Sequence, residues 1–245
     1  MTQYNKIANE YKNVIKDDIV RIYGYEPLYF NTIGNLKGKA VLDLACGEGL
    51  FTRKMVERGA SQVEGVDISE KMIELARNNK AFSIKYHLYD VAQMPKLGEF
   101  DVVTAPWLLH YAKSKEELLK MCSVIVDNLK KGGKFVGLIP NPNFPIVPEE
   151  KYRKYRVSSI LESAELKEGC KIKITLYNAK EDKVSFSYFH WSADTYLSTL
   201  KKSGLRNTKM IPASITEEGI QKYGKDFWEY YQKNPETAII YGEKE

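Results

Sequence analysis

Hydrophobic and polar positions in the 245-residue chain follow two periods that alternate along the middle of the sequence. Short apolar runs have the length of buried strands, and the segments between them carry apolar residues at helical spacing. The predicted strands are 40–44, 62–66, 83–88, 100–105 and 134–140, and the predicted helices between them are 50–58, 70–79 and 114–130. This alternation predicts a parallel sheet that is covered by helices on both faces.

The two ends of the chain follow other patterns. Residues 3–17 and 19–34 precede the first strand and are predicted to be helices. After Pro140, a connector rich in proline and asparagine (141–148) leads into 144–168, which we interpret as irregular to helical. The remaining predicted elements are a hairpin of strands 171–178 and 183–190, a helix at 193–203, and strands 206–213 and 237–243 with a helix at 216–232 between them.

The composition indicates one sizeable core, because the chain is 43% hydrophobic. We therefore expect a single domain that spans residues 1–245. Its predicted parts are an N-terminal helical cap (1–38), a ligand-binding core (39–140), an insertion (144–190) and a C-terminal part (191–245) that completes the sheet.

Charge and cysteine content limit the expected partners and location. The net charge of +5 comes from 37 basic and 32 acidic residues without a clustered basic stripe, so we expect no nucleic-acid partner. No run approaches the ~18 apolar residues of a membrane span, and the polar N-terminus lacks a signal-peptide core. The three cysteines have no metal-ligand spacing and no even number for disulfides, which is typical of reduced thiols in the cytoplasm. The sequence leaves monomer and homodimer open.

The segment from residue 41 to residue 67 carries the most specific chemistry. Its first strand ends in the turn Gly47-Glu48-Gly49, a helix begins near Leu50, and the next strand ends in Asp67. Glycines at such a turn let the backbone approach a ligand, and an acid about 20 residues later can accept hydrogen bonds from both ribose hydroxyls. The pattern predicts a nucleoside site at the carboxyl ends of the strands.

Two departures from the dinucleotide fingerprint narrow the ligand. Thr52 stands where the third glycine would be, and Asp43 lies inside the strand before the turn. A carboxylate beside a pyrophosphate would repel it, whereas the same carboxylate would stabilise an ammonium or sulfonium group. The ligand that fits is a positively charged nucleoside without phosphate, a description that S-adenosylmethionine meets.

These residues resemble motif I and the acidic loop of class I S-adenosylmethionine-dependent methyltransferases. Within that family the chain most resembles the small-molecule group that contains toxoflavin synthase, an N-methyltransferase of an azapteridine-type heterocycle. The segments that carry the resemblance are A-N-E-Y (8–11), D-L-A-C-G-E-G-L-F-T-R-K (43–54), G-V-D-I-S (65–69), L-L-H-Y-A (108–112), F-H-W-S-A-D-T-Y (189–196) and G-K-D-F-W (224–228). The resemblance implies an α/β, Rossmann-like doubly wound sheet, mostly parallel with an antiparallel last strand, and a lid formed by 144–190 over the cofactor cleft.

The resemblance also implies which residues hold S-adenosylmethionine. The methionine half is assigned to Asp43, Ala45, Gly47 and Gly49, the ribose to Asp67, and the adenine to Ile68, Met72, Asp90 and Val91, while Ala105 and Tyr11 lie against the cofactor. For each acid the alternative is a helix cap or a turn. For Tyr11 the alternative is plain packing.

The predicted acceptor side follows the strand at 100–105. Trp107 and Tyr111 are expected to contact a small-molecule acceptor there, and Tyr152 and His190 to contact it from the insertion. His110 is the candidate catalytic residue, since an imidazole can orient an acceptor or take its proton. The alternative for His110 is a core histidine that is bonded to the backbone. No cluster has metal-ligand spacing, so we expect no metal.

The expected reaction is direct in-line transfer of a methyl group to a small molecule, with a ring nitrogen of a planar heterocycle as the favoured acceptor. Two alternatives stay open, which are O-methylation of a small phenol or carboxylate and a module that binds the nucleoside without turnover. An NAD-dependent dehydrogenase is disfavoured by Asp43 and by the missing third glycine.

Overall fold

The structure is a computed structural model that describes residues 3–79, 83–146 and 149–245. Its main strands are β1 (Ala40–Leu44), β2 (Gln62–Asp67), β3 (Lys85–Leu88), β4 (Phe100–Pro106), β5 (Leu129–Pro140), β9 (Leu205–Pro212) and β10 (Thr237–Lys244). In the described residues they form one sheet in the order β3-β2-β1-β4-β5-β10-β9. Strands β1 to β5 run parallel, and β10 runs antiparallel to both β5 and β9. The expected Rossmann-like sheet with an antiparallel last strand is confirmed.

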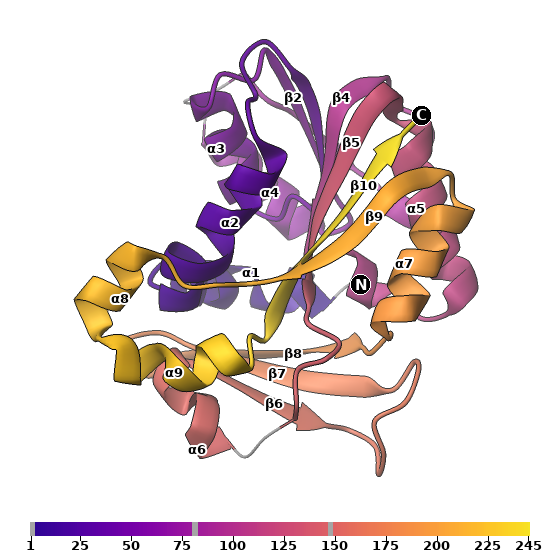
Figure 1. Cartoon of the computed structure of the whole chain (residues 1–245). Helices are drawn as coiled ribbons and strands as arrows, with labels where there is room; N and C mark the ends of the chain where they lie inside the picture. Colours follow the sequence, from indigo (N-terminus) through magenta and orange to yellow (C-terminus); the bar gives the residue numbers. More distant parts are fainter. Residues whose placement is uncertain (1–2, 80–82, 147–148) are drawn as a thin grey trace.

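Helices cover both faces of this sheet, as the alternation of elements predicts (Figure 1). On one face lie α2 (Glu26–Ile33), α3 (Leu50–Glu57) and α4 (Glu70–Asn78), and on the other lie α5 (Lys115–Asp127) and α7 (Ala193–Lys202). Neighbouring residues of β1 serve the two faces, because Val41 packs in the cluster with α2 and α3 whereas Leu42 packs in the cluster with α5 and α7.

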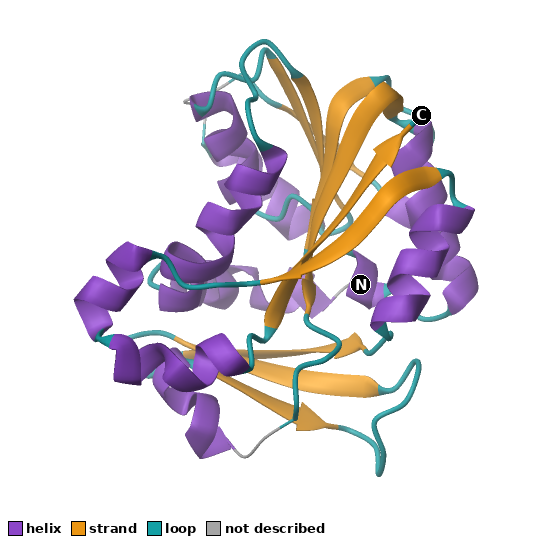
Figure 2. Cartoon of the chain, in the orientation of Figure 1, coloured by secondary structure: helices purple, strands orange, loops and turns teal. Residues whose placement is uncertain are grey.

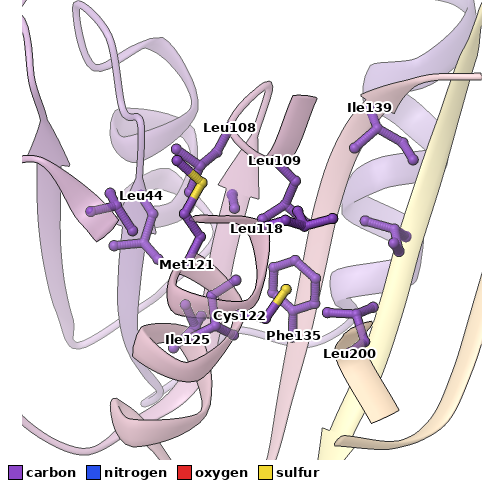
Figure 3. Packing of buried hydrophobic residues seen from close by; sticks show 14 of the residues in the cluster. Leu44, Leu108, Leu109, Leu118, Met121, Cys122, Ile125, Phe135, Ile139 and Leu200 are labelled. Carbon is purple, nitrogen blue, oxygen red and sulfur yellow. The ribbon is translucent and has the colours of Figure 1, made fainter. Parts of the chain in front are cut away.

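The cluster beneath α5 shows how the helical pattern produces this packing (Figure 3). Leu118, Met121, Cys122 and Ile125 recur at helical spacing and point from α5 toward the sheet, where they meet residues such as Phe135 of β5. Ser114 caps the start of this helix by accepting a hydrogen bond from the backbone nitrogen of Glu117 at 3.2 Å.

A second, three-stranded antiparallel sheet lies in the expected insertion. It consists of β6 (Val157–Leu161), β7 (Lys171–Tyr177) and β8 (Lys183–Phe189). Figures 1 and 2 show it across the carboxyl ends of the parallel strands, with α1 (Gln3–Ile15) between the two sheets. This arrangement encloses the edge of the main sheet at which ligands of such folds bind.

Three elements differ from the sequence prediction. Residues 157–161, predicted to be irregular to helical, form strand β6, because pairing with β7 supplies partners that the local sequence does not announce. The single helix predicted at 216–232 is two helices, α8 (Glu217–Tyr223) and α9 (Lys225–Lys233), since Gly224 has φ 87° between them.

The third difference lies at the end of α5, which stops at Asp127 instead of residue 130. Asn128 is buried, and its Oδ1 accepts hydrogen bonds from the backbone nitrogens of Leu97 and Gly98. The chain therefore enters β5 at Leu129, earlier than the predicted strand at 134–140. The insertion also contains the short helix α6 (Glu149–Tyr152). Residues 147–148 of the predicted connector lie outside the described residues.

Candidate ligand-binding site

A cavity of about 490 Å³ lies at the carboxyl ends of β1, β2 and β4. Helix α1 and strand β8 contribute its opposite wall. The sequence-predicted residues that line it are Tyr11, Ala45, Gly47, Asp67, Ile68, Met72, Asp90, Val91, Trp107 and Tyr111. The fold therefore brings together residues that are spread over a hundred positions of the chain.

The glycine turn and the acid after β2 form one unit at the centre of this cavity. The backbone nitrogen of Gly47 donates a hydrogen bond to Asp67 Oδ2 at 2.8 Å, and that of Ser69 donates to Asp67 Oδ1 at 2.8 Å. Burial raises the pKa of Asp67, and these backbone donors oppose the rise. Each carboxylate oxygen keeps a further lone pair, so Asp67 can still accept a hydroxyl from a bound ligand.

The backbone around this unit adopts conformations that leave room for a ligand. Gly47 has φ 56°, and a Cβ placed there would meet no atom within 4 Å. Ala45 and Trp107 are non-glycine residues in the left-handed region, with φ 57° and 64°, at the ends of β1 and β4. Such backbone strain gathers at ligand sites, where the surrounding structure enforces it.

Asp43 does not line the cavity, which corrects the expectation that it faces the ligand. The residue is fully buried, and its carboxyl accepts hydrogen bonds from the hydroxyls of Thr52 at 2.7 Å and Thr104 at 2.8 Å. Burial raises its pKa to about 7. Asp43 therefore ties β1 to β4 and α3, and Thr52, which breaks the dinucleotide fingerprint, is one of its hydrogen-bond donors.

Gly49 and Ala105 also lie behind the cavity surface instead of on it. Gly49 has φ 83° and begins α3, and a Cβ there would lie 2.5 Å from the hydroxyl of Tyr86, so glycine is required by packing. Ala105 is a buried residue of β4 within the α5 cluster.

The acid after β3 has a local role besides its place on the cavity wall. Asp90 caps the short helix 91–93, because its Oδ1 accepts a hydrogen bond from the backbone nitrogen of Ala92 at 3.0 Å. This is the capping alternative that the sequence left open. It coexists with a cavity position for Asp90 and for the buried Val91.

Helix α1 closes the cavity from the side of the insertion. The hydroxyls of Tyr4 and Tyr111 are hydrogen-bonded at 2.6 Å, and the ring of Tyr4 packs edge-on against that of Tyr11. The side-chain amide of Gln3 pairs with the backbone of Ser187 in β8, donating at 3.0 Å and accepting at 3.2 Å. The cap, the core and the insertion therefore meet at this cavity.

Several residues that line the cavity were not predicted from the sequence. These are chiefly Tyr4, Arg21 and Tyr25, which line the cavity together with the predicted residues. Tyrosine occurs 17 times in the chain, so no single ring stood out. Helical spacing offered one usable signal, since Tyr4 and Tyr11 lie two turns apart on α1 and share a face.

His110 lies outside the main cavity, in a smaller cavity of about 70 Å³ beside it. Its side chain is 2% exposed, and its Nδ1 has no hydrogen-bond partner. Burial lowers the pKa of His110 to about 3, so the imidazole is neutral near pH 7 and is a weak proton acceptor. This disfavours the general base and leaves an orienting role as a hypothesis.

The two insertion residues expected at the acceptor lie elsewhere. Tyr152 is buried against the rings of Phe144 and Tyr155, and its hydroxyl donates to the carbonyl oxygen of Asn234. His190 follows β8 and lines a separate hollow of about 10 Å³, which is room for about one water molecule. The aromatic and basic side chains of the insertion pack the second sheet. The sequence alone could not distinguish such packing from a binding surface.

Among residues 3–79, 83–146 and 149–245, no group of three or more His, Cys, Asp or Glu side chains is arranged to hold a metal ion. In the same residues, no helix has the length and apolar character that crossing a membrane requires.

Comparison with known proteins finds relatives for the central segment of the chain. Residues 41–133 match the model of a methyltransferase domain family. An uncharacterized protein of Haemophilus influenzae is 37% identical over 45% of this chain and 46% of its own length. A ubiquinone biosynthesis O-methyltransferase of Coxiella burnetii is 35% identical over 44% of this chain and 47% of its own length. The chain thus spans about half the length of these curated relatives.

Solved structures extend the similarity to most of the chain. An S-adenosylmethionine-dependent methyltransferase from Mesorhizobium loti superposes with a TM-score of 0.65 over 89% of this chain and 96% of its own, at 21% identity. At that identity the similarity concerns the fold. Residues 41–133 are thus similar to a methyltransferase domain, and most of the chain has the fold of that S-adenosylmethionine-dependent methyltransferase.

Proposed function

We propose that the 490 Å³ cavity binds S-adenosylmethionine and that the chain transfers its methyl group to a small molecule. The observation that carries this proposal is the hydrogen bond between Gly47 and Asp67 in the cavity wall. It joins an open glycine backbone, suited to a close ligand approach, to a carboxylate suited to a ribose. The matched methyltransferase domain covers the same two residues.

The cavity suits a nucleoside in two further respects. No side chain occupies the space above Gly47, and Ile68 and Met72 provide apolar surface beside Asp67 for a base. The exposed fraction of Ile68 is 47%, a high value for a large apolar residue and one that a stacked ring would lower.

The protein's part in such a reaction is to position and to desolvate. The bound cofactor would supply a methyl group that its sulfonium already activates. Asp67 and the Gly47 backbone hold the nucleoside, and Trp107 and Tyr111 border the side from which an acceptor approaches. Helix α1 excludes water through the Tyr4–Tyr111 and Gln3–Ser187 hydrogen bonds. We propose the insertion at 144–190 as the lid of this site.

For the acceptor we propose a ring nitrogen of a planar heterocycle. The rings of Tyr25, Trp107 and Tyr188 line the cavity and offer flat faces and edges for stacking. An acceptor of low pKa needs no protein base, which agrees with the low pKa of His110, about 3, because that pKa makes the imidazole a weak base. We also propose a cytoplasmic location, supported by three buried, unpaired cysteines.

A second candidate is O-methylation of a small molecule, and the name of the Coxiella burnetii relative favours it. A third is a module that binds the nucleoside without turnover. Incubation of the chain with S-adenosylmethionine and a panel of heterocycles, phenols and carboxylates tests all three. Formation of S-adenosylhomocysteine with heterocycles, and an N-methyl signal in the NMR spectrum of the product, is the expected result. An O-methyl product supports the second candidate, and tight binding without turnover supports the third.

A further inference from the structure

A second cavity of about 70 Å³ lies beside the main one and shares aromatic residues of its wall. The residues that line both cavities include Tyr4, Tyr11, Tyr25, Trp107, Tyr111 and Tyr188. An acceptor held between these rings can therefore extend from the main cavity into the inner one. The rest of the inner wall comes from α1, from β6, β7, β8 and the start of β10, and from connecting residues that include Asp18, Phe144 and Arg156.

Two carboxyl groups from opposite ends of the chain line this inner cavity. Asp18 is held by hydrogen bonds to its Oδ1 from the backbone nitrogens of Val20 and Arg21, and its Oδ2 accepts the hydroxyl of Tyr25 at 3.0 Å. Asp18 is thus satisfied by its neighbours and serves as a fixed acidic group.

Glu236 is less completely satisfied. Its Oε1 accepts the hydroxyl of Thr237 at 3.0 Å, whereas its Oε2 is buried and has no hydrogen-bond partner. The hydroxyl of Tyr231 lies beside Glu236 and lowers its pKa by hydrogen bonding, although neither this hydroxyl nor Oε2 has a partner of ordinary geometry. A buried oxygen without a donor is costly, and a ligand that brings an N–H group removes that cost.

His110 is the second incompletely bonded polar side chain in the same wall. It is 2% exposed, and its Nδ1 has no partner. Its ring packs edge-on against Tyr188. Two of the six buried side-chain atoms that lack a hydrogen-bond partner in the described residues thus belong to this one cavity wall, where a polar ligand group can pair with them.

The charges around the inner cavity favour a cation. Burial raises the pKa of Glu236 to about 7, and the charge of Asp18 adds to the rise. Arg156 also lines this cavity, but its guanidinium and that of Arg21 bind other groups. Arg21 binds Glu26 and the carbonyl oxygens of Ile15 and Lys16. The Nη1 of Arg156 donates to the carbonyl oxygen of Asp17 at 2.8 Å.

We propose that the inner cavity binds a cationic nitrogen of the methyl acceptor, in the form of an amidinium or protonated amino group attached to a planar ring. Glu236 Oε2 accepts an N–H of this group, Asp18 adds a second negative charge, and the rings of Trp107 and Tyr188 lie against the cation. The methylated atom then lies at the other end of the acceptor, toward the main cavity. This inference rests on the proposed function and narrows its acceptor to bases.

The test compares two probes of nearly equal shape, benzamidine, which is a planar cation, and benzamide, which is neutral. Each is titrated by calorimetry into the full chain saturated with S-adenosylhomocysteine. We expect benzamidine to bind at least about tenfold more tightly than benzamide, as hydrogen bonds to charged groups do. Glu236→Gln should lose about that factor for benzamidine and leave benzamide unchanged. Glu229→Gln, which removes a carboxylate from the exposed side of α9, is the matched control and should behave as the parent.

Thermal unfolding and S-adenosylhomocysteine affinity establish that the Glu236→Gln chain is folded, and the comparison of the two probes in the parent needs no variant. Equal binding of the probes, binding of neither, or an unchanged preference in Glu236→Gln overturns the inference. Failure of the parent to bind S-adenosylhomocysteine is a separate result that overturns the proposed function instead.

Discussion

The backbone nitrogen of Gly47 lies 2.8 Å from Oδ2 of Asp67 and donates a hydrogen bond to it. This contact joins the turn after β1 to the end of β2, next to the place between β1 and β4 where the strand order of the sheet reverses. The carboxylate fixes the turn and, through the backbone nitrogen of Ser69, the start of α4. The Asp67 side chain therefore fixes the shape of the cavity and offers a hydrogen-bond acceptor to a ligand.

Replacing Asp67 tests this double role. In Asp67→Asn, only the amide oxygen can accept a hydrogen bond, so the backbone nitrogen of either Gly47 or Ser69 loses its acceptor. A ribose hydroxyl of the ligand then meets a weaker hydrogen-bond acceptor. The Kd for S-adenosylhomocysteine should rise about ten- to a hundredfold in calorimetry. Glu74→Gln, at an exposed ion pair on α4, should bind as the parent does. An unchanged Kd in Asp67→Asn would mean that Asp67 does not contact the ligand.

Alanine at Gly47 separates stability from binding. Gly47 and Gly38 have similar positive φ, 56° and 72°, and a Cβ at either would meet nothing within 4 Å, but only Gly47 lines the cavity. Both substitutions should cost a similar backbone strain of about 1 kcal/mol in urea unfolding. Only Gly47→Ala should weaken S-adenosylhomocysteine binding. Equal loss of affinity in both variants would contradict a close ligand approach at Gly47.

The main sheet could be predicted from the sequence because short segments of the chain determine its strands and helices. The run around Val41 and Leu42 is apolar on both faces, and Ser114 marks a helix start, so element type and order followed. Strand β6 could not be predicted in this way, since Val157–Leu161 becomes a strand only through its pairing with Ile172–Leu176 in β7. The break at Gly224 was also missed, because an isolated glycine is tolerated inside many helices.

The buried carboxyl of Asp43 predicts a pH dependence of stability. Its pKa is raised to about 7 in the folded chain, whereas an unfolded aspartate has a pKa of about 3.9. Between these values the folded state holds a proton that the unfolded state has lost, so stability should fall as the pH rises through this window. In Asp43→Asn, the fall in unfolding free energy between pH 5 and 7.5 should be smaller by roughly 3 kcal/mol. Urea unfolding of both proteins at the two pH values measures this, and identical pH profiles would show that Asp43 is ionised throughout.

His110 should not titrate near neutral pH. Its pKa is lowered to about 3 because the imidazole is buried without a counter-charge, so it stays neutral from pH 5 to 8. Imidazole resonances followed by NMR should show no midpoint for His110 in this range. A midpoint near the ordinary value of 6.5 would restore His110 as a candidate general base.

The hydroxyl pair of Tyr4 and Tyr111 predicts how tightly α1 closes. Tyr111→Phe removes the 2.6 Å hydrogen bond and keeps both rings, so the dissociation rate of bound S-adenosylhomocysteine should increase about two- to tenfold. Tyr241→Phe is a suitable control, because its hydroxyl bonds Glu243 on β10, away from the cavity. A stopped-flow competition experiment measures both rates. Equal rates in the parent and in Tyr111→Phe would show that the contact does not restrain the ligand.

The candidate site was only partly predictable, for a physical reason. Asp67 and Gly47 could be placed by strand ends and spacing, because the topology of the sheet brings strand ends together. The full burial of Asp43 could not be predicted, since it depends on hydrogen bonds from two threonines, one in α3 and one in β4. The proposed role of Glu236 could not be predicted for the same reason, because only the folded chain brings it into one cavity wall with Asp18.

The central claim is that the cavity at Gly47 and Asp67 holds S-adenosylmethionine, and calorimetry tests it most directly. Separate titrations of the chain with S-adenosylmethionine, S-adenosylhomocysteine and NADH should give saturable 1:1 binding of the first two and none of the third. Binding of NADH without binding of S-adenosylmethionine would contradict the account.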